Sequence, residues 1–243
     1  MIVSHNELVS CVSKAFLGMR RSCGEADVIA GMVADLQMVG LDGVRHFNKA
    51  SPFLGVDKDC AVSISYVSKQ NIVVDLHHGS IACHLPSILD YAVEKLSESA
   101  SLTIDLQQCH NRWLGYSELV RLAAKGIACR AQWVNGSSPQ KTLYVLNRGC
   151  VAPEVFFSEL LKSSDVDFYS MSIDLSLSDF DLNESTKDYS IHTLSKDLLG
   201  AQRRAWREGI EVDDLQWQIL KKAAEIFLVE NSEKSMQGAG GVV

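Results

Sequence analysis

The sequence predicts an α/β protein in which helices pack on a mixed sheet. Apolar residues recur at helical spacing in residues 5–20 and 84–98. Apolar and polar residues alternate with period two in residues 61–67 and 101–107, a pattern typical of half-buried strands. Because the two patterns follow one another along the chain, we expect the helices and strands to share one core.

Helices are predicted near both ends of the chain. Ser4 and Glu7 form a capping box, which favours a helix that starts directly after Ser4. A second helix is expected to end at Gly40, because glycine is common just after the last turn. Toward the other end, residues 195–208 and 213–228 read as two helices separated by a glycine.

The sheet is predicted in the middle of the chain. The expected strands are 61–67, 71–76, 101–107, 130–134, 142–147 and 167–178. The turn-rich stretch "NGSSPQK" (135–141) would join two of them as a hairpin. The expected helices here are 84–98, 113–125 and 153–162, the last with Pro153 in its first turn.

These elements are expected to form one continuous domain over residues 1–234, since no repeat or composition shift marks a boundary. It would have a helical part at 5–40, sheet and helices at 60–180, and a helical part at 195–230. Residues 165–190 would either cover a pocket or complete the sheet. The Gly-rich residues 235–243 are expected to be a flexible tail.

Composition restricts the class of protein. The net charge is −7 and the basic residues are not gathered into a stripe, so nucleic acid is not an expected partner. The apolar runs are shorter than a membrane span, which takes about 18 residues or more. The N-terminal stretch lacks the pattern of a signal peptide, and the seven cysteines are odd in number and dispersed. We therefore expect a cytoplasmic protein that does not bind membranes.

Two Cys-His pairs, Cys83-His84 and Cys109-His110, raise the question of a metal site. Neighbouring residues in a strand point to opposite faces, so each pair would supply only one ligand. We expect no metal site, and an unrelated metal-binding protein is kept only as a third alternative.

The candidate chemistry centres on two histidines. His110 follows a predicted strand and precedes a predicted helix, a position where side chains often face a cleft. His46 follows an Asp-Gly turn in "VGLDGVRHFNK" and stands next to Arg45. A histidine can donate or accept a proton near neutral pH, but either could also be a packing residue. Trp113 and Tyr116 could line a pocket or belong to the core.

Several stretches carry a family resemblance. They are "EADVIAGMVADLQMVGLDGVRHF", "VVDLHHG", "QQCHNRWLGY", "AAKGIA" and "REGIEVDDLQWQILKKAAE", in this order. Together they resemble the malate/L-lactate dehydrogenase family with the sulfolactate dehydrogenase-like fold, which is not a Rossmann fold. The resemblance implies homodimers, a nicotinamide site shared between subunits, and reduction of 2-keto acids or related imines.

The resemblance also carries residue roles. His110 matches the histidine of the family's Asn-His-Phe-Gly turn, which faces cofactor and substrate, and Asp42 and Gly43 match an earlier Gly-x-Asp-Ser-His-Gly-Val turn. Here the Ser-His pair, whose histidine serves in proton transfer, is missing between Asp42 and Gly43. Cys109 replaces the asparagine before His110. The chain is also shorter than the family's members, mainly in their cofactor-binding middle part.

We therefore predict a shortened, diverged relative without the dehydrogenase activity, which acts as a small-molecule-binding or accessory protein. The alternative is an NAD(P)H-dependent oxidoreductase acting on a small keto acid or imine. In that case His110 or His46 would supply the proton. The predicted substrate-binding residues are Arg45, Asp42, Trp113 and Tyr116. A homodimer is expected in either case.

Overall fold

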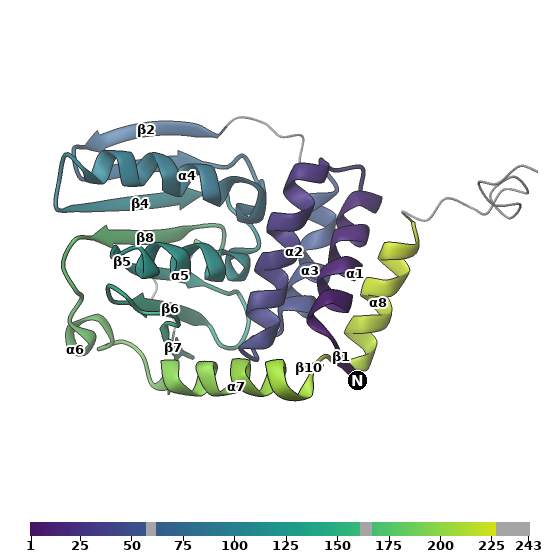
Figure 1. The fold of residues 1–243 in the computed structure, drawn as a ribbon. Helices are drawn as coiled ribbons and strands as arrows, with labels where there is room; N and C mark the ends of the chain where they lie inside the picture. Colours follow the sequence, from purple (N-terminus) through teal and green to yellow (C-terminus); the bar gives the residue numbers. More distant parts are fainter. Residues whose placement is uncertain (57–61, 161–166, 227–243) are drawn as a thin grey trace, which may run out of the picture.

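The structure is a computed structural model that describes residues 1–56, 62–160 and 167–226 (Figure 1). Its helices are α1 His5–Gly18, α2 Cys23–Met38, α3 Gly43–Leu54, α4 Ile81–Leu96, α5 Tyr116–Ala124, α6 Leu182–Ser185, α7 Ser195–Glu208 and α8 Asp214–Glu225, with a 3₁₀ turn η1 at Arg112–Gly115. Its strands are β1 Ile2–Val3, β2 Ser63–Ser68, β3 Asn71–Asp75, β4 Ser101–Gln107, β5 Ala128–Val134, β6 Lys141–Leu146, β7 Glu154–Ser158, β8 Met171–Ser176, β9 Ile191–Thr193 and β10 Ile210–Glu211.

Eight of the strands form one mixed sheet in the order β2-β3-β4-β8-β5-β6-β7-β9. β3 and β4 are parallel and are joined through α4, whereas the other neighbouring pairs described are antiparallel. β1 and β10 form a separate antiparallel pair, which joins the N-terminal residues to the segment between α7 and α8. This topology confirms the predicted mixed sheet with packed helices.

The core lies between the sheet and its helices. In β4 the alternation predicted from sequence is observed: Leu102, Ile104 and Leu106 are buried, while Thr103 and Asp105 between them are half-buried. α4 and α5 lie over this face of the sheet, and α1, α2, α3 and α8 pack together beside it (Figure 1). Burying one such large apolar side chain contributes roughly 1.5–3 kcal/mol, so these rows fix the register of the sheet.

One predicted helix is wrong. Residues 154–158 of the expected helix 153–162 form β7, which pairs antiparallel with β6. The reason is tertiary: Val155 and Phe156 are buried against neighbouring strands, and this burial outweighs a short, weak helical pattern. Pro153 stands directly before the strand, where its missing N–H costs no ladder hydrogen bond.

The segment after Gly40 also differs from the prediction. It was expected as a turn, but a twelve-residue helix, α3, begins at Gly43. The stretch 167–178 does complete the sheet, because β8 lies in its middle, between β4 and β5. Beyond β8, Phe180 and Tyr189 cover a small second core on β6 and β7.

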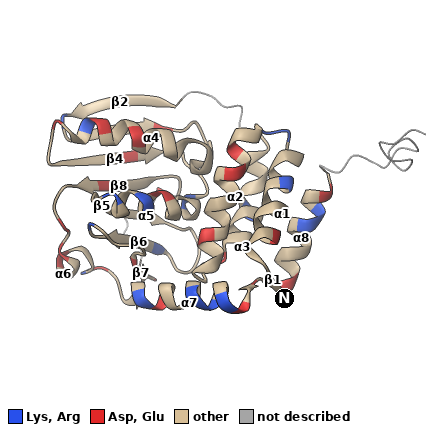
Figure 2. Ribbon diagram, viewed as in Figure 1, with Lys and Arg blue, Asp and Glu red and all other residues tan. Residues whose placement is uncertain are grey.

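The predicted tail at 235–243 lies outside the described residues. Buried core residues run from Val3 to Ala224, but a single domain over residues 1–234 stays a prediction. No helix in the described part of the chain is long and apolar enough to cross a membrane. Basic residues gather on α7, at Lys196, Arg203, Arg204 and Arg207 (Figure 2).

Candidate functional site

The corner between α2 and α3 is built by close backbone contact. A Cβ on Gly43 would lie 2.1 Å from the carbonyl oxygen of Val33 and 2.8 Å from the backbone nitrogen of Gln37, so only glycine fits. The Gln37 side chain accepts a hydrogen bond from the Val44 N–H at 2.9 Å and donates one to the Glu211 carbonyl at 2.8 Å. The glycine of the Asp-Gly pair is therefore explained by the fold.

α3 is docked on the segment after β4 by two pairs of stacked rings. His46 stacks on Trp113, with ring centroids 4.8 Å apart and planes at 20°. Phe53 stacks on His110, with centroids 4.0 Å apart and planes at 19°. Positions 46 and 53 are two helical turns apart and so lie on one side of α3. The two predicted catalytic histidines therefore lie along one seam.

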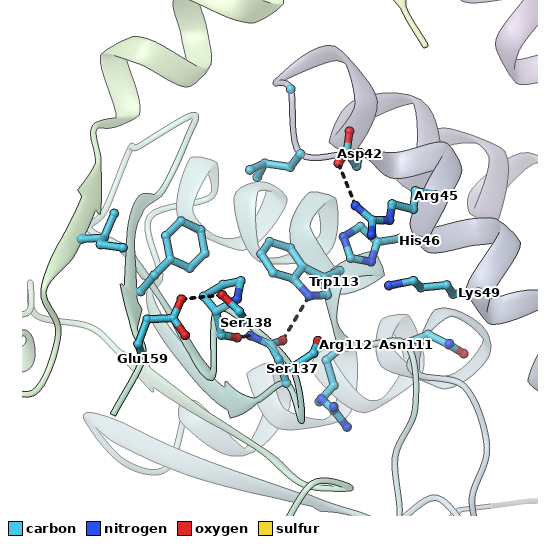
Figure 3. Close-up of a pocket in the computed structure, with 16 residues that line it drawn as sticks. Asp42, Arg45, His46, Lys49, Asn111, Arg112, Trp113, Ser137, Ser138 and Glu159 are labelled. Carbon is cyan, nitrogen blue, oxygen red and sulfur yellow. Dashed lines mark hydrogen bonds and ion pairs between the residues drawn. The ribbon is translucent and has the colours of Figure 1, made fainter. Parts of the chain in front are cut away.

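A pocket of about 530 Å³ opens at one end of this seam (Figure 3). Its walls come from α3, the segment 111–113, the β5–β6 loop and the ends of β7 and β9. Four of the predicted site residues line it: Asp42, Arg45, His46 and Trp113. The structure thus brings Trp113, which is close to His110 in the sequence, into one pocket with Asp42, Arg45 and His46.

The other two predicted residues lie elsewhere. His110 lines a neighbouring hollow of about 320 Å³, which shares Asn111, Arg112 and Asn135 with the pocket. Tyr116 is 4% exposed and belongs to the core, where its ring meets that of Tyr144 edge-on.

His110 is enclosed by rings. Phe53 covers one face, the centroid of Tyr169 lies 5.1 Å away at a steep angle, and that of His78 lies 5.7 Å away. Burial lowers the pKa of His110, and the neighbouring His78 and Arg112 act in the same direction. Burial and these two neighbours therefore disfavour the protonated form of His110, which remains half-buried.

His46 is also held neutral. Burial lowers its pKa to about 3, and the positive charges of Lys49 and Arg45 lower it further in the same direction. The protonated form of His46 is therefore disfavoured at neutral pH. As a neutral imidazole, the ring can still donate one hydrogen bond from one nitrogen and accept one at the other.

Charge is distributed unevenly over the pocket. Arg45 and Lys49 are exposed and lie four residues apart on α3, so they share one side of the helix. Arg45 approaches Asp42 at 3.9 Å, whereas Lys49 has no ion-pair partner in the part of the chain that is described. Glu159 lines the far wall and accepts a hydrogen bond from the Ser138 hydroxyl at 2.6 Å.

Asn135 holds the aromatic floor of the pocket to the β5–β6 loop. Its side-chain oxygen accepts hydrogen bonds from the indole N–H groups of Trp113 and Trp133, at 3.2 and 2.8 Å. Its amide nitrogen donates to the Pro139 carbonyl and to the Thr142 hydroxyl, at 2.7 and 2.8 Å. Every hydrogen-bonding position of this amide is therefore used.

Sequence analysis missed Lys49, Asn135 and Glu159. The spacing of Arg45 and Lys49 would have pointed to a shared face if α3 had been predicted as a helix. The loop that contains Asn135 was recognised, but its pairing with two tryptophans depends on the fold. Nothing in the sequence around Glu159 marks it, because it reaches the pocket only through the pairing of β7.

One of the two Cys-His pairs contains a deeply buried thiol. Cys109 is fully buried, and burial raises the pKa of its thiol to about 11. In residues 1–56, 62–160 and 167–226, no three His, Cys, Asp or Glu side chains gather in a way that could hold a metal ion.

Comparison with known proteins gives a family of unknown function and a set of dehydrogenase structures. Residues 3–111 match the model of a family described as "Protein of unknown function (DUF3726)". No curated protein matches the sequence significantly.

Three solved structures illustrate the structural likeness. The chain is similar to malate dehydrogenase from Pyrococcus horikoshii OT3, with 8% identity, coverage of 96% of this chain and 97% of that one, and a TM-score of 0.69. It is also similar to sulfolactate dehydrogenase from Methanocaldococcus jannaschii, with 9% identity, coverage of 93% of this chain and 97% of that one, and a TM-score of 0.66. The third structure is Δ1-piperideine-2-carboxylate reductase from Pseudomonas syringae pvar. tomato, with 12% identity, coverage of 92% of this chain and 99% of that one, and a TM-score of 0.61.

The alignments span nearly the whole of both chains. At such low identity the likeness speaks for the fold alone. It confirms the fold predicted from sequence: the chain has the fold of the malate, lactate and sulfolactate dehydrogenase-like structures.

Proposed function

We propose that this protein binds a small anionic molecule in the pocket beside α3 and does not catalyse the dehydrogenase reactions named for its structural neighbours. The observation that carries the proposal is the placement of Arg45 and Lys49 at a pocket whose histidine, His46, stays neutral. Two cations at the mouth of a concave, partly apolar pocket raise the local concentration of an anion.

Loss of the dehydrogenase chemistry is supported by the state of the two histidines. Reduction of a keto acid by hydride places negative charge on the carbonyl oxygen, which needs a proton donor within hydrogen-bonding reach. Burial and the charges of Lys49 and Arg45 lower the pKa of His46 to about 3, which disfavours the imidazolium form that would act as this donor. His110 contacts the rings of Phe53 and Tyr169 and does not line the pocket.

The residues present fit only part of a nicotinamide cofactor. Arg45 and Lys49 would suit its phosphate groups. Trp113 covers one face of His46 and Phe53 covers one face of His110, which leaves a nicotinamide ring at most one face of either histidine to stack on. No hydride-transfer step follows from these side chains.

The second candidate is an NAD(P)H-dependent oxidoreductase that acts on a small keto acid or imine. It is favoured by the names of the neighbours, two of which are malate and sulfolactate dehydrogenases and one a reductase of a cyclic imine. Under this candidate the proton would come from His46 or His110. A homodimer is proposed for both candidates, on the resemblance alone.

Binding measurements separate the two candidates. Isothermal titration calorimetry of the whole chain with phosphate, malonate and hexanoate is expected to show binding of at least one anion. Binding should fall about tenfold in Lys49→Met and in Arg45→Met, as expected for a lost charge-assisted hydrogen bond. The matched control, Lys196→Met, removes an exposed lysine on α7 and should bind like the wild type.

The same preparation is then assayed with NADH and NADPH. A bound cofactor at 100 times its dissociation constant would stabilise the protein by about 2.7 kcal/mol and raise its melting temperature. We expect neither such a shift nor turnover of a panel of keto acids. Turnover that disappears in His46→Phe or His110→Phe would overturn the first proposal in favour of the second, and no binding of any anion would overturn it outright.

A further inference from the structure

We propose that the pocket takes a zwitterion whose two charges are separated by an apolar stretch, with its carboxylate at α3 and its ammonium group at Glu159. This inference rests on the proposed function, because it names the class of ligand for the same pocket. It is carried by the order in which charged and apolar side chains follow one another across the pocket.

The first wall is cationic. Arg45 and Lys49 project from the same side of α3 and line the pocket. The third basic group of this wall, His46, is neutral, since the two neighbouring cations and burial oppose its protonation. Figure 3 shows Arg45, His46 and Lys49 together on one side of Trp113. Asp42 also lines this wall and approaches Arg45 at 3.9 Å, so Lys49 is the cation of the wall that no described carboxylate pairs with. Lys49 is therefore the group that we expect to attract a carboxylate.

The opposite wall is acidic. Glu159 follows β7 directly, lines the pocket and lies on the other side of Trp113 in Figure 3. The Ser138 hydroxyl donates to one oxygen of its carboxylate, which orients the group. A carboxylate accepts about four hydrogen bonds, so one bond from Ser138 leaves room for an ammonium donor. No basic side chain in the described ranges pairs with Glu159.

The middle of the pocket is apolar. Trp113 forms the floor, Phe157 lies 6.2 Å from it between ring centroids, and Ile191 lines the pocket from β9. A simple anion would fill the cationic end and leave Glu159 without a counter-charge. A simple cation would fill the acidic end and leave Lys49 without one, since Arg45 already lies 3.9 Å from Asp42. A molecule with both charges and an apolar chain between them satisfies all three parts.

The experiment uses probes that differ by one charged group. The affinities of wild-type protein for 6-aminohexanoate, hexanoate and hexylamine are measured by calorimetry, followed by the ω-amino acids from 4-aminobutanoate to 8-aminooctanoate. We expect one chain length of the zwitterion to bind at least about tenfold more tightly than hexanoate, because it adds a charge-assisted hydrogen bond. Hexylamine is expected to bind more weakly than both.

Two variants assign the ends of the probe. Glu159→Gln is expected to lower the affinity for the best zwitterion about tenfold and to leave hexanoate unchanged. Lys49→Met is expected to weaken both. Ser138→Ala, which removes only the orienting hydrogen bond, provides a milder test of the acidic end if Glu159→Gln fails to fold. Glu184→Gln, at an exposed residue of α6, is the matched control and should change nothing.

The outcomes distinguish the two proposals. If hexanoate binds as tightly as every zwitterion and Glu159→Gln has no effect, the zwitterion inference is overturned and anion binding stands. If a folded wild-type protein binds none of these probes and none of phosphate, malonate and hexanoate, both are overturned.

Discussion

At the scale of single residues, His46 combines a packing role with an unusual charge state. Its ring lies on Trp113, and its folded-state pKa of about 3 is far below the ordinary value of 6.5. Above pH 6.5 the imidazole is neutral in both the folded and the unfolded protein. As the pH falls from 6.5 toward 3, the unfolded chain binds a proton that the folded chain does not. Acid therefore destabilises the fold through this residue.

The substitution His46→Phe tests this link. It keeps a flat ring on Trp113 and removes the titration. Between pH 6.5 and 4, the free energy of unfolding of the wild type should fall more steeply than that of the variant, by at most about 1.4 kcal/mol per pH unit. Urea unfolding at a series of pH values measures both slopes. Parallel curves for the two proteins would show that His46 titrates normally in the fold.

Gly43 offers a second prediction at this scale. A Cβ at this position would overlap the Val33 carbonyl of α2, which cannot move without breaking the helix. Gly43→Ala should therefore lower the free energy of unfolding by about 3 kcal/mol or more, measured by urea unfolding. The matched control is Gly31→Ala in α2, where a Cβ meets nothing within 4 Å.

The control has an expected sign of its own. Alanine is favoured over glycine inside a helix by roughly 0.5–1 kcal/mol, so Gly31→Ala should stabilise the protein. If both alanine variants behave alike, the close approach of α2 and α3 is not what requires glycine at position 43.

At the scale of elements, prediction from sequence succeeded where the pattern was long and the burial one-sided. The helical spacing of α4 and the alternation of β4 both follow from one buried face. It failed for α3 and β7. α3 begins directly after Asp42, whose φ of 52° is typical of a turn, and its helical path is set by contacts with α2 and η1. β7 is short, and its conformation depends on pairing with β6.

The β5–β6 hairpin yields an element-scale prediction. Asn135 binds the indole N–H groups of Trp113 and Trp133 and closes its own loop. Asn135→Ala leaves two indole donors without their acceptor and should cost about 2–4 kcal/mol of unfolding free energy. Tryptophan fluorescence during urea unfolding measures the loss. Asn183→Ala, at an exposed position of α6, should stay within about 0.5 kcal/mol of wild type, and an equal loss in both would contradict the role of Asn135.

At the scale of the whole molecule, the pocket is assembled from segments that are far apart in sequence. Lys49 arrives on α3 and Glu159 arrives at the end of β7, and their relation depends on the complete order of the sheet. The motifs around His46 and His110 can therefore be identified from the sequence, whereas the side chains that lie opposite them cannot. The predicted histidines proved to be neighbours along one seam, whereas the opposing charge at Glu159 required the fold.

The last prediction concerns whether the helical part and the sheet unfold together. Gln37 is 8% exposed and links α2 to the start of α3 and to β10, which pairs with the N-terminal strand. Gln37→Met removes both hydrogen bonds at similar volume and should cost about 2–3 kcal/mol. If residues 1–234 form one domain, that cost appears equally at distant sites, since unfolding is then all-or-none.

Trp217 in α8 and Trp133 in β5 report on the two regions, because both are buried. In protein labelled with 5-fluorotryptophan, their fluorine NMR signals can be followed separately during urea unfolding. We expect one shared midpoint in the wild type and the same displacement of both signals in Gln37→Met. Gln132→Met, at an exposed position of β5, should leave both midpoints in place. Separate midpoints for the two tryptophans would show that the helical part and the sheet are two cooperative units, and that the pocket lies where they meet.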